Sequence, residues 1–272
     1  MSRYIRALGE LIKRIGEEEA RKARYKEITE HLWALRNAGL GNDHIQTELA
    51  GLKQYFRYLS RTGQRYDDPA RNIFLKDQRT KDIQFQDLFT PAELELLLHR
   101  PNRYGLLEWR NKLIISFYIY QGLTTGELEK LTLKDLDLDR QVVFIRSSAK
   151  LCSRLLPLQS QQLNFLERYL IFDRPHLLKE QTEILFLTKL GATVKGEDCQ
   201  YLIESAKGLF PDRLLNPITI RQSVLVNLFK KGMDIRDVQL IAGHRYASST
   251  ERYKPADLSG LRNSMEQFHP LF

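Results

Sequence analysis

Apolar residues in the first part of the chain recur at the three- and four-residue spacing of amphipathic helices. A charged run, residues 17–26, interrupts them and is typical of a solvated helix face. Asn42 is placed to cap a longer helix, and Arg61-Thr62-Gly63 ends it. The pattern predicts an all-helical domain over residues 1–78, with these apolar positions: Ile5, Leu8, Leu11, Ile12, Ile15, Ile28, Leu32, Leu35, Ile45, Leu49, Leu52, Phe56 and Leu59.

A polar stretch with few apolar anchors, KDQRTKDIQFQD, follows this domain. It predicts an interdomain linker, which we place at residues 79–87. A second domain, 88–272, then opens with a helix start: Thr90 is the cap, Pro91 takes the first helical position, and Glu93 completes a capping box. The length of 272 residues also favours two domains.

The second domain contains both helix-like and strand-like sequence patterns. Residues 141–146 are β-branched and aromatic, residues 147–153 form a turn, and residues 154–158 return as a second strand. We expect the short apolar run 184–187 to be a third strand. The predicted fold class is therefore mainly α with a small antiparallel β-sheet, and the expected helices cover residues 108–121, 122–133, 159–172 and 197–210.

The stretch from Asn216 to Lys254 places an arginine among apolar residues. Thr219 is positioned to cap a helix that runs to about Lys231, and Arg221 falls inside the apolar arc of that helix. A buried guanidinium needs an anionic partner. The first helical turn also favours anions. The sequence leaves two explanations for Arg221: a bound anion or a structural ion pair with a carboxylate.

A second helix in this stretch ends directly before a histidine. Asp234 is placed to cap it, and Gly243 is a C-cap glycine, so that His244 sits at a rigid helix end. Tyr253 follows nine residues later, after a small polar run. Taken singly, such a histidine is usually a local hydrogen-bonding residue, and such a tyrosine usually packs.

Composition and charge favour a polyanionic partner. The net charge is +8 and the sequence pI is about 9.4, which suits nucleic acid, although many proteins are this basic. The two cysteines, Cys152 and Cys199, form neither a disulfide framework nor a metal pattern. The start lacks a signal-peptide core, and no apolar run approaches the length of a membrane span. We therefore expect a cytoplasmic protein.

The combination of arginine, histidine and tyrosine resembles the tyrosine recombinase family, also called phage integrases. In that family the motif reads roughly H-x-x-R-H, then L-G-H, then Y. Arg221 matches the arginine, His244 follows 23 residues later after Ala242-Gly243, and Tyr253 matches the tyrosine. The resemblance covers roughly residues 25–272, and residues 25–72 are similar to the family's helical core-binding domain.

The resemblance implies a two-domain clamp on duplex DNA and a reaction that needs no cofactor or metal. It implies that Tyr253 attacks a backbone phosphate and forms a 3′-phosphotyrosyl link. Arg221 and His244 would bind the non-bridging oxygens. Lys150, in the hairpin turn, matches the catalytic lysine that protonates the departing 5′ oxygen. The alternative is that Lys150 is a solvated hairpin residue.

Three positions depart from the family pattern. Thr124 stands where the first catalytic arginine is expected in G-L-R-x-x-E-L, Ile218 replaces the first histidine, and Gln222 replaces the residue after Arg221. We expect an atypical but active site-specific recombinase of a mobile element, with Arg146 or Arg245 as a compensating cation. The alternatives are a degenerate recombinase-like DNA-binding protein and, more distantly, a type IB topoisomerase.

Two further surfaces follow from the sequence. Four basic residues recur every four positions and form a candidate phosphate-binding stripe, or else a solvated helix face: Lys53, Arg57, Arg61 and Arg65. The end of the chain is amphipathic and resembles the tail that links recombinase protomers into dimers and tetramers on DNA. The alternative is packing on its own domain, and the tail residues concerned are Leu261, Met265, Phe268 and Phe272.

Overall fold

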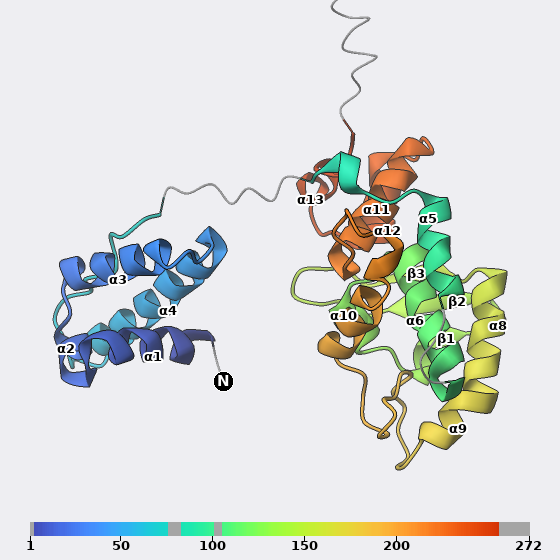
Figure 1. The fold of residues 1–272 in the computed structure, drawn as a ribbon, viewed down its shortest axis with the longest axis horizontal. Coiled ribbons are helices and arrows are strands. Elements are labelled where there is room, and N and C mark those ends of the chain that lie inside the picture. The colour runs from blue at the N-terminus through green and yellow to red at the C-terminus, as the bar shows by residue number, and fades with distance from the viewer. Residues whose placement is uncertain (1–2, 76–82, 101–104, 256–272) are drawn as a thin grey trace, which may run out of the picture. The chain divides into compact units, whose positions relative to one another are not determined.

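The computed structural model describes residues 3–75, 83–100 and 105–255 (Figure 1). These residues form two compact units, Met1–Asp82 and Ile83–Phe272. The amphipathic tail predicted to mediate self-association, residues 258–272, lies outside the described residues. No helix in the described ranges is long and apolar enough to cross a membrane.

The first unit is all-helical, as the sequence predicts. Its longest helix, α4, packs against α1 and α3. Gly41 is the N-cap of α4, and Asn42 is already its first residue, so the predicted cap at Asn42 is wrong by one position. The apolar faces meet in one core around Leu52 and Phe56, both fully buried. The helices are α1 (Arg3–Ile15), α2 (Glu17–Lys22), α3 (Tyr25–Asn37) and α4 (Asn42–Arg61).

The second unit is built around α6, in which every residue from Leu113 to Ile119 is buried (Figure 1). Helices α8, α10 and α11 pack around it. The helices of this unit are α5 (Pro91–Leu96), α6 (Glu108–Tyr120), α7 (Thr125–Leu128), α8 (Ser160–Arg168), a π-helical segment (Tyr169–Asp173), α9 (Arg174–Leu177), α10 (Gly196–Glu204), α11 (Pro217–Lys230), α12 (Ile235–Ala242) and α13 (Ala247–Glu251).

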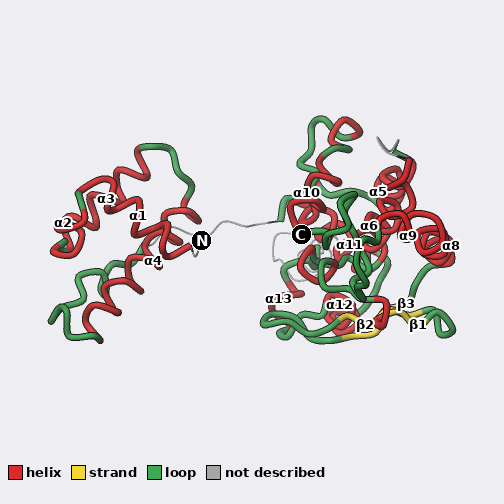
Figure 2. Tube along the Cα trace, turned by 90° about the horizontal axis from the view of Figure 1, so that it is seen from below, coloured by secondary structure: helices red, strands yellow, loops and turns green. Residues whose placement is uncertain are grey.

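A three-stranded antiparallel sheet lies along one side of this unit, with β3 packed beside α12 (Figure 2). In β2, Val143 and Ile145 are buried and Phe144 between them is exposed, which is the alternation of a half-buried strand. Val143 pairs with Leu156 of the next strand. The strands are β1 (Leu136–Asp137), β2 (Val142–Ile145) and β3 (Arg154–Pro157), in that order.

The prediction of a third strand at residues 184–187 is wrong, because the sheet takes Leu136–Asp137 instead. The segment 184–187 makes only isolated bridges, to Thr132 and to Thr193. Leu185, Phe186 and Leu187 are all buried in the core. Consecutive burial identifies a segment that is covered on both sides, and it does not show whether another strand pairs with it.

Two predicted helices end earlier than the sequence suggests, and a third changes helix type along its length. The helix after Gly122 stops at Leu128, the helix of residues 159–172 widens into a π-helix after Arg168, and the helix of residues 197–210 stops at Glu204. Short 3-10 turns continue two of these segments, at Leu133–Asp135 and Lys207–Leu209. Apolar periodicity shows which segments are helical, but it does not define exactly where each helix ends.

Candidate active site

Helix α11 carries Arg221 on its buried side. Its N-cap is Asn216, whose side chain accepts from the Thr219 backbone N–H at 2.9 Å, and Pro217 takes the first helical position. The predicted cap at Thr219 is therefore wrong, because Thr219 is the third helical residue and completes the capping box. Arg221 is only 7% exposed, in agreement with its place in the apolar arc.

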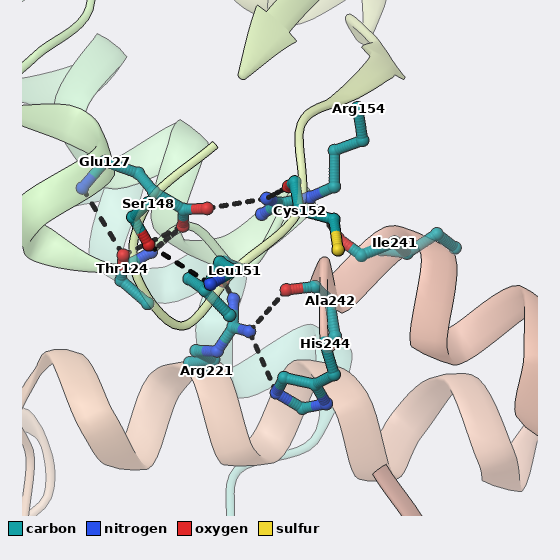
Figure 3. Close-up of polar contacts among 11 residues, drawn as sticks. Thr124, Glu127, Ser148, Leu151, Cys152, Arg154, Arg221, Ile241, Ala242 and His244 are labelled. Atoms are coloured by element: carbon teal, nitrogen blue, oxygen red, sulfur yellow. Dashed lines mark hydrogen bonds and ion pairs between the residues drawn. The ribbon is translucent and has the colours of Figure 1, made fainter. Parts of the chain in front are cut away.

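The guanidinium of Arg221 is held by two backbone carbonyls and a histidine (Figure 3). It donates to Gly122 O, to Ala242 O at 2.7 Å, and to His244 Nε2 at 3.2 Å. Burial lowers the pKa of Arg221 from its usual value. Within the described residues no carboxylate pairs with it, so the structural ion pair weighed from the sequence is absent there. Among the side chains that the structure describes, the buried Arg221 cation therefore forms no ion pair.

Gly122 allows this close approach. Its φ of +59° is in the left-handed region that glycine adopts without strain, and a Cβ there would lie 3.3 Å from the Val224 side chain. The segment after α6 therefore turns tightly against α11, and the Gly122 carbonyl reaches Arg221.

His244 is fixed by the end of α12. Asp234 caps this helix and Gly243 ends it with φ +70°, as predicted. The backbone N–H of His244 donates to Gln239 O, and the Gln239 amide donates back to His244 O at 3.0 Å. Burial, and next the charge of Arg221, lower the pKa of His244 to about 4, so its ring is neutral at pH 7.

The structure brings Tyr253 to this histidine. The two rings stack with their centroids 5.7 Å apart and their planes 19° apart. Tyr253 also packs against the small apolar cluster formed by Leu225, Val238 and Ala242. Arg221, His244 and Tyr253 thus lie together although they come from three separate segments.

The hairpin turn that contains Lys150 is attached to the same place. The Cys152 N–H donates to Gly243 O at 2.8 Å, and Leu151 forms a β-bridge with His244. Inside the turn, Ser148 N donates to Leu151 O and the Ser148 hydroxyl accepts from Leu151 N. Lys150, next to the bridge, is exposed, so its side chain is accessible beside His244.

A buried ion pair that the sequence did not reveal lies behind these residues. Arg154 of β3 donates to Glu127 Oε1 at 2.6 Å and to Ile241 O at 2.7 Å. The other oxygen of Glu127 accepts from the hydroxyl and the N–H of Thr124, the N-cap of α7. Burial raises the pKa of Glu127, but its bonds to Arg154 and Thr124 outweigh burial and leave the pKa lowered.

These contacts give the site a net positive charge. Two buried guanidiniums, Arg154 and Arg221, lie here with one buried carboxylate, Glu127, which pairs with Arg154. A Cβ at Gly243 would overlap the Arg154 guanidinium, so glycine is required there by space as well as by backbone conformation. An arginine inside a predicted strand was the sequence feature that could have pointed to Arg154, but its partner Glu127 lies 27 residues earlier in the chain.

The two candidate compensating arginines differ in their surroundings. Arg146 bonds to Asp135 Oδ1 at 2.9 Å and to Thr132 Oγ1 at 3.0 Å, with half its side chain exposed. With Thr124 it lines a cavity of about 130 Å³. Arg245 is exposed and follows His244 directly. Ile218, at the position of the expected histidine, is 67% exposed.

In the first unit, three of the four residues of the predicted basic stripe lie on α4. Arg57 and Arg61 are exposed, and Lys53 lies over the Phe74 ring at 4.4 Å. Arg65 does not continue the stripe, because the helix ends at Arg61. The Arg65 side chain is only 13% exposed and bonds to Asp67 and to Arg21 O, so the prediction of a four-residue helical stripe is wrong at Arg65.

No group of three or more histidine, cysteine or acidic side chains suited to a metal occurs among the described residues. The site combines a tyrosine hydroxyl, a neutral imidazole, an accessible lysine and a guanidinium without an ion pair among the described residues, which suits the binding and substitution of a phosphate ester.

Comparison with known proteins identifies the family. Residues 87–258 match the Phage integrase family, and this chain belongs to it. The tyrosine recombinase XerD of Halalkalibacterium halodurans is 27% identical over 254 residues, covering 92% of this chain and 83% of that protein. The XerD recombinase of Yersinia pestis is 28% identical, covering 82% of this chain and 74% of its own length.

Solved structures share the fold. XerH recombinase in its pre-cleavage complex with difH substrate superimposes with a TM-score of 0.70 at 19% identity, covering 90% of this chain and 70% of that one. The Tn1549 transposon integrase in complex with a circular intermediate DNA gives 0.64 at 20% identity, covering 90% and 85%. The mostly helical fold with a small antiparallel sheet is thus the fold of tyrosine recombinases.

Proposed function

We propose that this protein is a site-specific DNA recombinase that cleaves and rejoins duplex DNA through a 3′-phosphotyrosyl intermediate. The observation that carries the proposal is the buried, unneutralised Arg221 in contact with His244, whose ring stacks on Tyr253. Membership of the Phage integrase family and similarity to XerD recombinases support the same reaction.

The proposed chemistry is a transesterification in which atoms balance without a cofactor. The Tyr253 hydroxyl loses its proton to solvent, its oxygen bonds to phosphorus as the bond to the 5′ oxygen breaks, and the leaving 5′ oxygen takes a proton from Lys150. Arg221 and His244 bind the non-bridging oxygens while negative charge develops. Rejoining reverses the steps, with a 5′ hydroxyl of a partner duplex as the nucleophile.

Arg146 is the better candidate for the cation that replaces the missing first arginine. It lines the same cavity as Thr124, the position where that arginine would start. To reach a phosphate its guanidinium has to leave Asp135 and Thr132, and its half-exposed side chain allows this. Arg245, adjacent to His244, is the second candidate.

The two units are proposed to have different roles on DNA. The first unit is proposed to be the core-binding domain, with Lys53, Arg57 and Arg61 of α4 on the phosphates. The second unit is proposed to carry out the chemistry.

Self-association on DNA would use the tail, through Leu261, Met265, Phe268 and Phe272. Deleting residues 261–272 should spare binding of one protomer and abolish cooperative assembly in a gel-shift titration; unaltered cooperativity would refute the role of the tail.

The second candidate function is a DNA-binding protein that has lost efficient cleavage. The observation in its favour is the neutral Thr124 hydroxyl at the first arginine position, together with the exposed Ile218 at the histidine position. Losing one oxyanion donor costs about 3–4 kcal/mol of transition-state stabilisation. A nicked suicide duplex from the native flanking DNA of the proposed mobile element separates the two functions, because only the recombinase forms a covalent adduct.

A further inference from the structure

Thr250 connects the two residues of the site that come from the end of the chain. Its hydroxyl lies 2.9 Å from His244 Nδ1, and its backbone carbonyl accepts from the Tyr253 N–H at 2.9 Å. Thr250 is completely buried, in contrast to its exposed neighbours Ser248 and Ser249. The buried Thr250 hydroxyl therefore makes an internal hydrogen bond to the His244 ring, unlike the exposed serine hydroxyls beside it.

The contacts of His244 determine where its ring carries the proton. Arg221 can only donate, so His244 Nε2 accepts from it and has no hydrogen. The ring is neutral at pH 7 and keeps one proton, which must then be on Nδ1. Nδ1–H therefore donates to the Thr250 hydroxyl. In this arrangement Nε2 offers only a lone pair toward the phosphate position.

That arrangement suits the free site but not the phosphate-bound site. When a phosphate takes the N–H groups of Arg221, Nε2 faces an anionic oxygen, and a lone pair there repels it. A donor is needed, so the ring proton has to be on Nε2. Nδ1 then needs a hydrogen-bond donor in place of an acceptor. A threonine hydroxyl has one O–H and two lone pairs, so it can serve as either partner.

We propose that Thr250 is a positioning residue whose hydroxyl lets His244 change tautomer when a phosphate replaces its contact with Arg221. The imidazole stays neutral: it loses the proton at Nδ1 and gains one at Nε2 through solvent. A backbone carbonyl or a carboxylate in place of the hydroxyl would hold the proton at Nδ1, because neither can donate. The inference about catalysis rests on the proposed function; the inference about the free tautomer does not.

The test compares two matched substitutions. Thr250→Val keeps the shape and removes the hydroxyl, whereas Thr250→Ser keeps the hydroxyl; Ser249→Ala is the control at the exposed neighbour. Nitrogen NMR of histidine-labelled protein, with His244→Gln for assignment, should show Nδ1 protonated and Nε2 unprotonated in free wild type and in Thr250→Ser. In free Thr250→Val, Arg221 still donates to Nε2, so Nδ1 should stay protonated; with duplex DNA bound, the ring proton should move to Nε2 in wild type and in Thr250→Ser but not in Thr250→Val. A free wild-type ring protonated at Nε2 overturns the proposal.

The second part of the test measures the rate at which each variant cleaves the suicide duplex. We expect Thr250→Ser to cleave within about threefold of wild type and Thr250→Val to cleave about 10- to 100-fold more slowly, the range known for loss of the partner that orients a metal-binding histidine. DNA affinity should be unchanged in both. Wild-type cleavage by Thr250→Val overturns the proposal. If wild type itself forms no adduct, the recombinase function fails, and the NMR comparison alone decides the role of Thr250.

Discussion

Arg154 donates to Glu127 at 2.6 Å, and both side chains are buried, 1% and 3% exposed. Because Glu127 also accepts from Thr124 and Arg154 donates to Ile241 O, one chain of contacts joins the start of α7, strand β3 and the end of α12 (Figure 3). Arg221 holds the next carbonyl of α12, at Ala242. The two arginines together fix the segment that presents His244.

Replacing Arg154 by methionine should destabilise the protein strongly. It leaves the Glu127 carboxylate buried without its cation, which costs about 3–5 kcal/mol. Urea denaturation measures the change. The control is Lys134→Met in the exposed Lys134–Glu183 pair, whose side chains are 76% and 55% exposed; its loss should cost at most about 1 kcal/mol. Similar costs for the two substitutions would show that the buried pair does not organise the site.

Thr124→Arg should have two opposed effects. It removes the cap of α7, with a cost of about 1 kcal/mol in stability. It also restores a guanidinium, so cleavage of a suicide duplex should increase. Thr124→Val loses the cap without adding a charge and is the matched control. A lower cleavage rate in both variants would mean that the cap at Thr124 outweighs any gain from the added cation.

A compensating arginine predicts a large loss of cleavage for one alanine substitution. We expect that loss, about 100-fold or more, for Arg146→Ala rather than for Arg245→Ala. Arg140→Ala, at an arginine whose side chain is 81% exposed and which lies next to β2, controls for removing a surface charge near the hairpin. Equal and small effects of all three would remove both candidates.

The basic stripe on α4 should contribute to the salt dependence of DNA binding. Each phosphate contact adds about 0.9 to the slope of log affinity against log salt. The triple variant Lys53→Ala, Arg57→Ala, Arg61→Ala should flatten the slope by up to about 3. A double variant of exposed lysines elsewhere in this unit, Lys22→Ala with Lys26→Ala, is the control. A slope that the triple variant leaves unchanged would exclude the stripe from the interface.

His244 should titrate well below an ordinary histidine, near pH 4 rather than 6.5. Its folded-state pKa is depressed, so its contribution to stability is fully present above pH 6.5 and is lost as pH falls from 6.5 toward 4. Proton NMR of the ring gives the midpoint. Arg221→Gln removes a nearby positive charge and should raise it. A midpoint at or above 6.5 in wild type would contradict the burial of this ring.

The sequence predicted those parts of the site that depend on local patterns. The burial of Arg221 followed from its place in an apolar arc, and the ends of α12 followed from Asp234 and Gly243. The helix–strand composition of the second unit followed from its two periodicities. Each of these features is decided by residues within a few positions of one another.

The parts that the sequence did not predict depend on contacts between distant segments. The pairing of Arg154 with Glu127 spans 27 residues. The hydrogen bond that attaches the hairpin to Gly243 joins segments separated by every element between β3 and α12. Leu136–Asp137 was too short to show strand periodicity, yet it pairs with β2, whereas the more apolar segment 184–187 does not join the sheet. The burial of a segment can be inferred from its own residues, whereas the strand with which it pairs cannot.

The most direct test of the whole account is formation of a covalent protein–DNA adduct on a nicked suicide duplex of the native flanking DNA. Wild type should form an adduct that withstands denaturation and is attached through Tyr253. Tyr253→Phe should bind the duplex with unchanged affinity and form none. If wild type forms no adduct while a Thr124→Arg, Ile218→His double variant does, the protein is a degenerate recombinase that binds DNA, and the account of an active enzyme is contradicted.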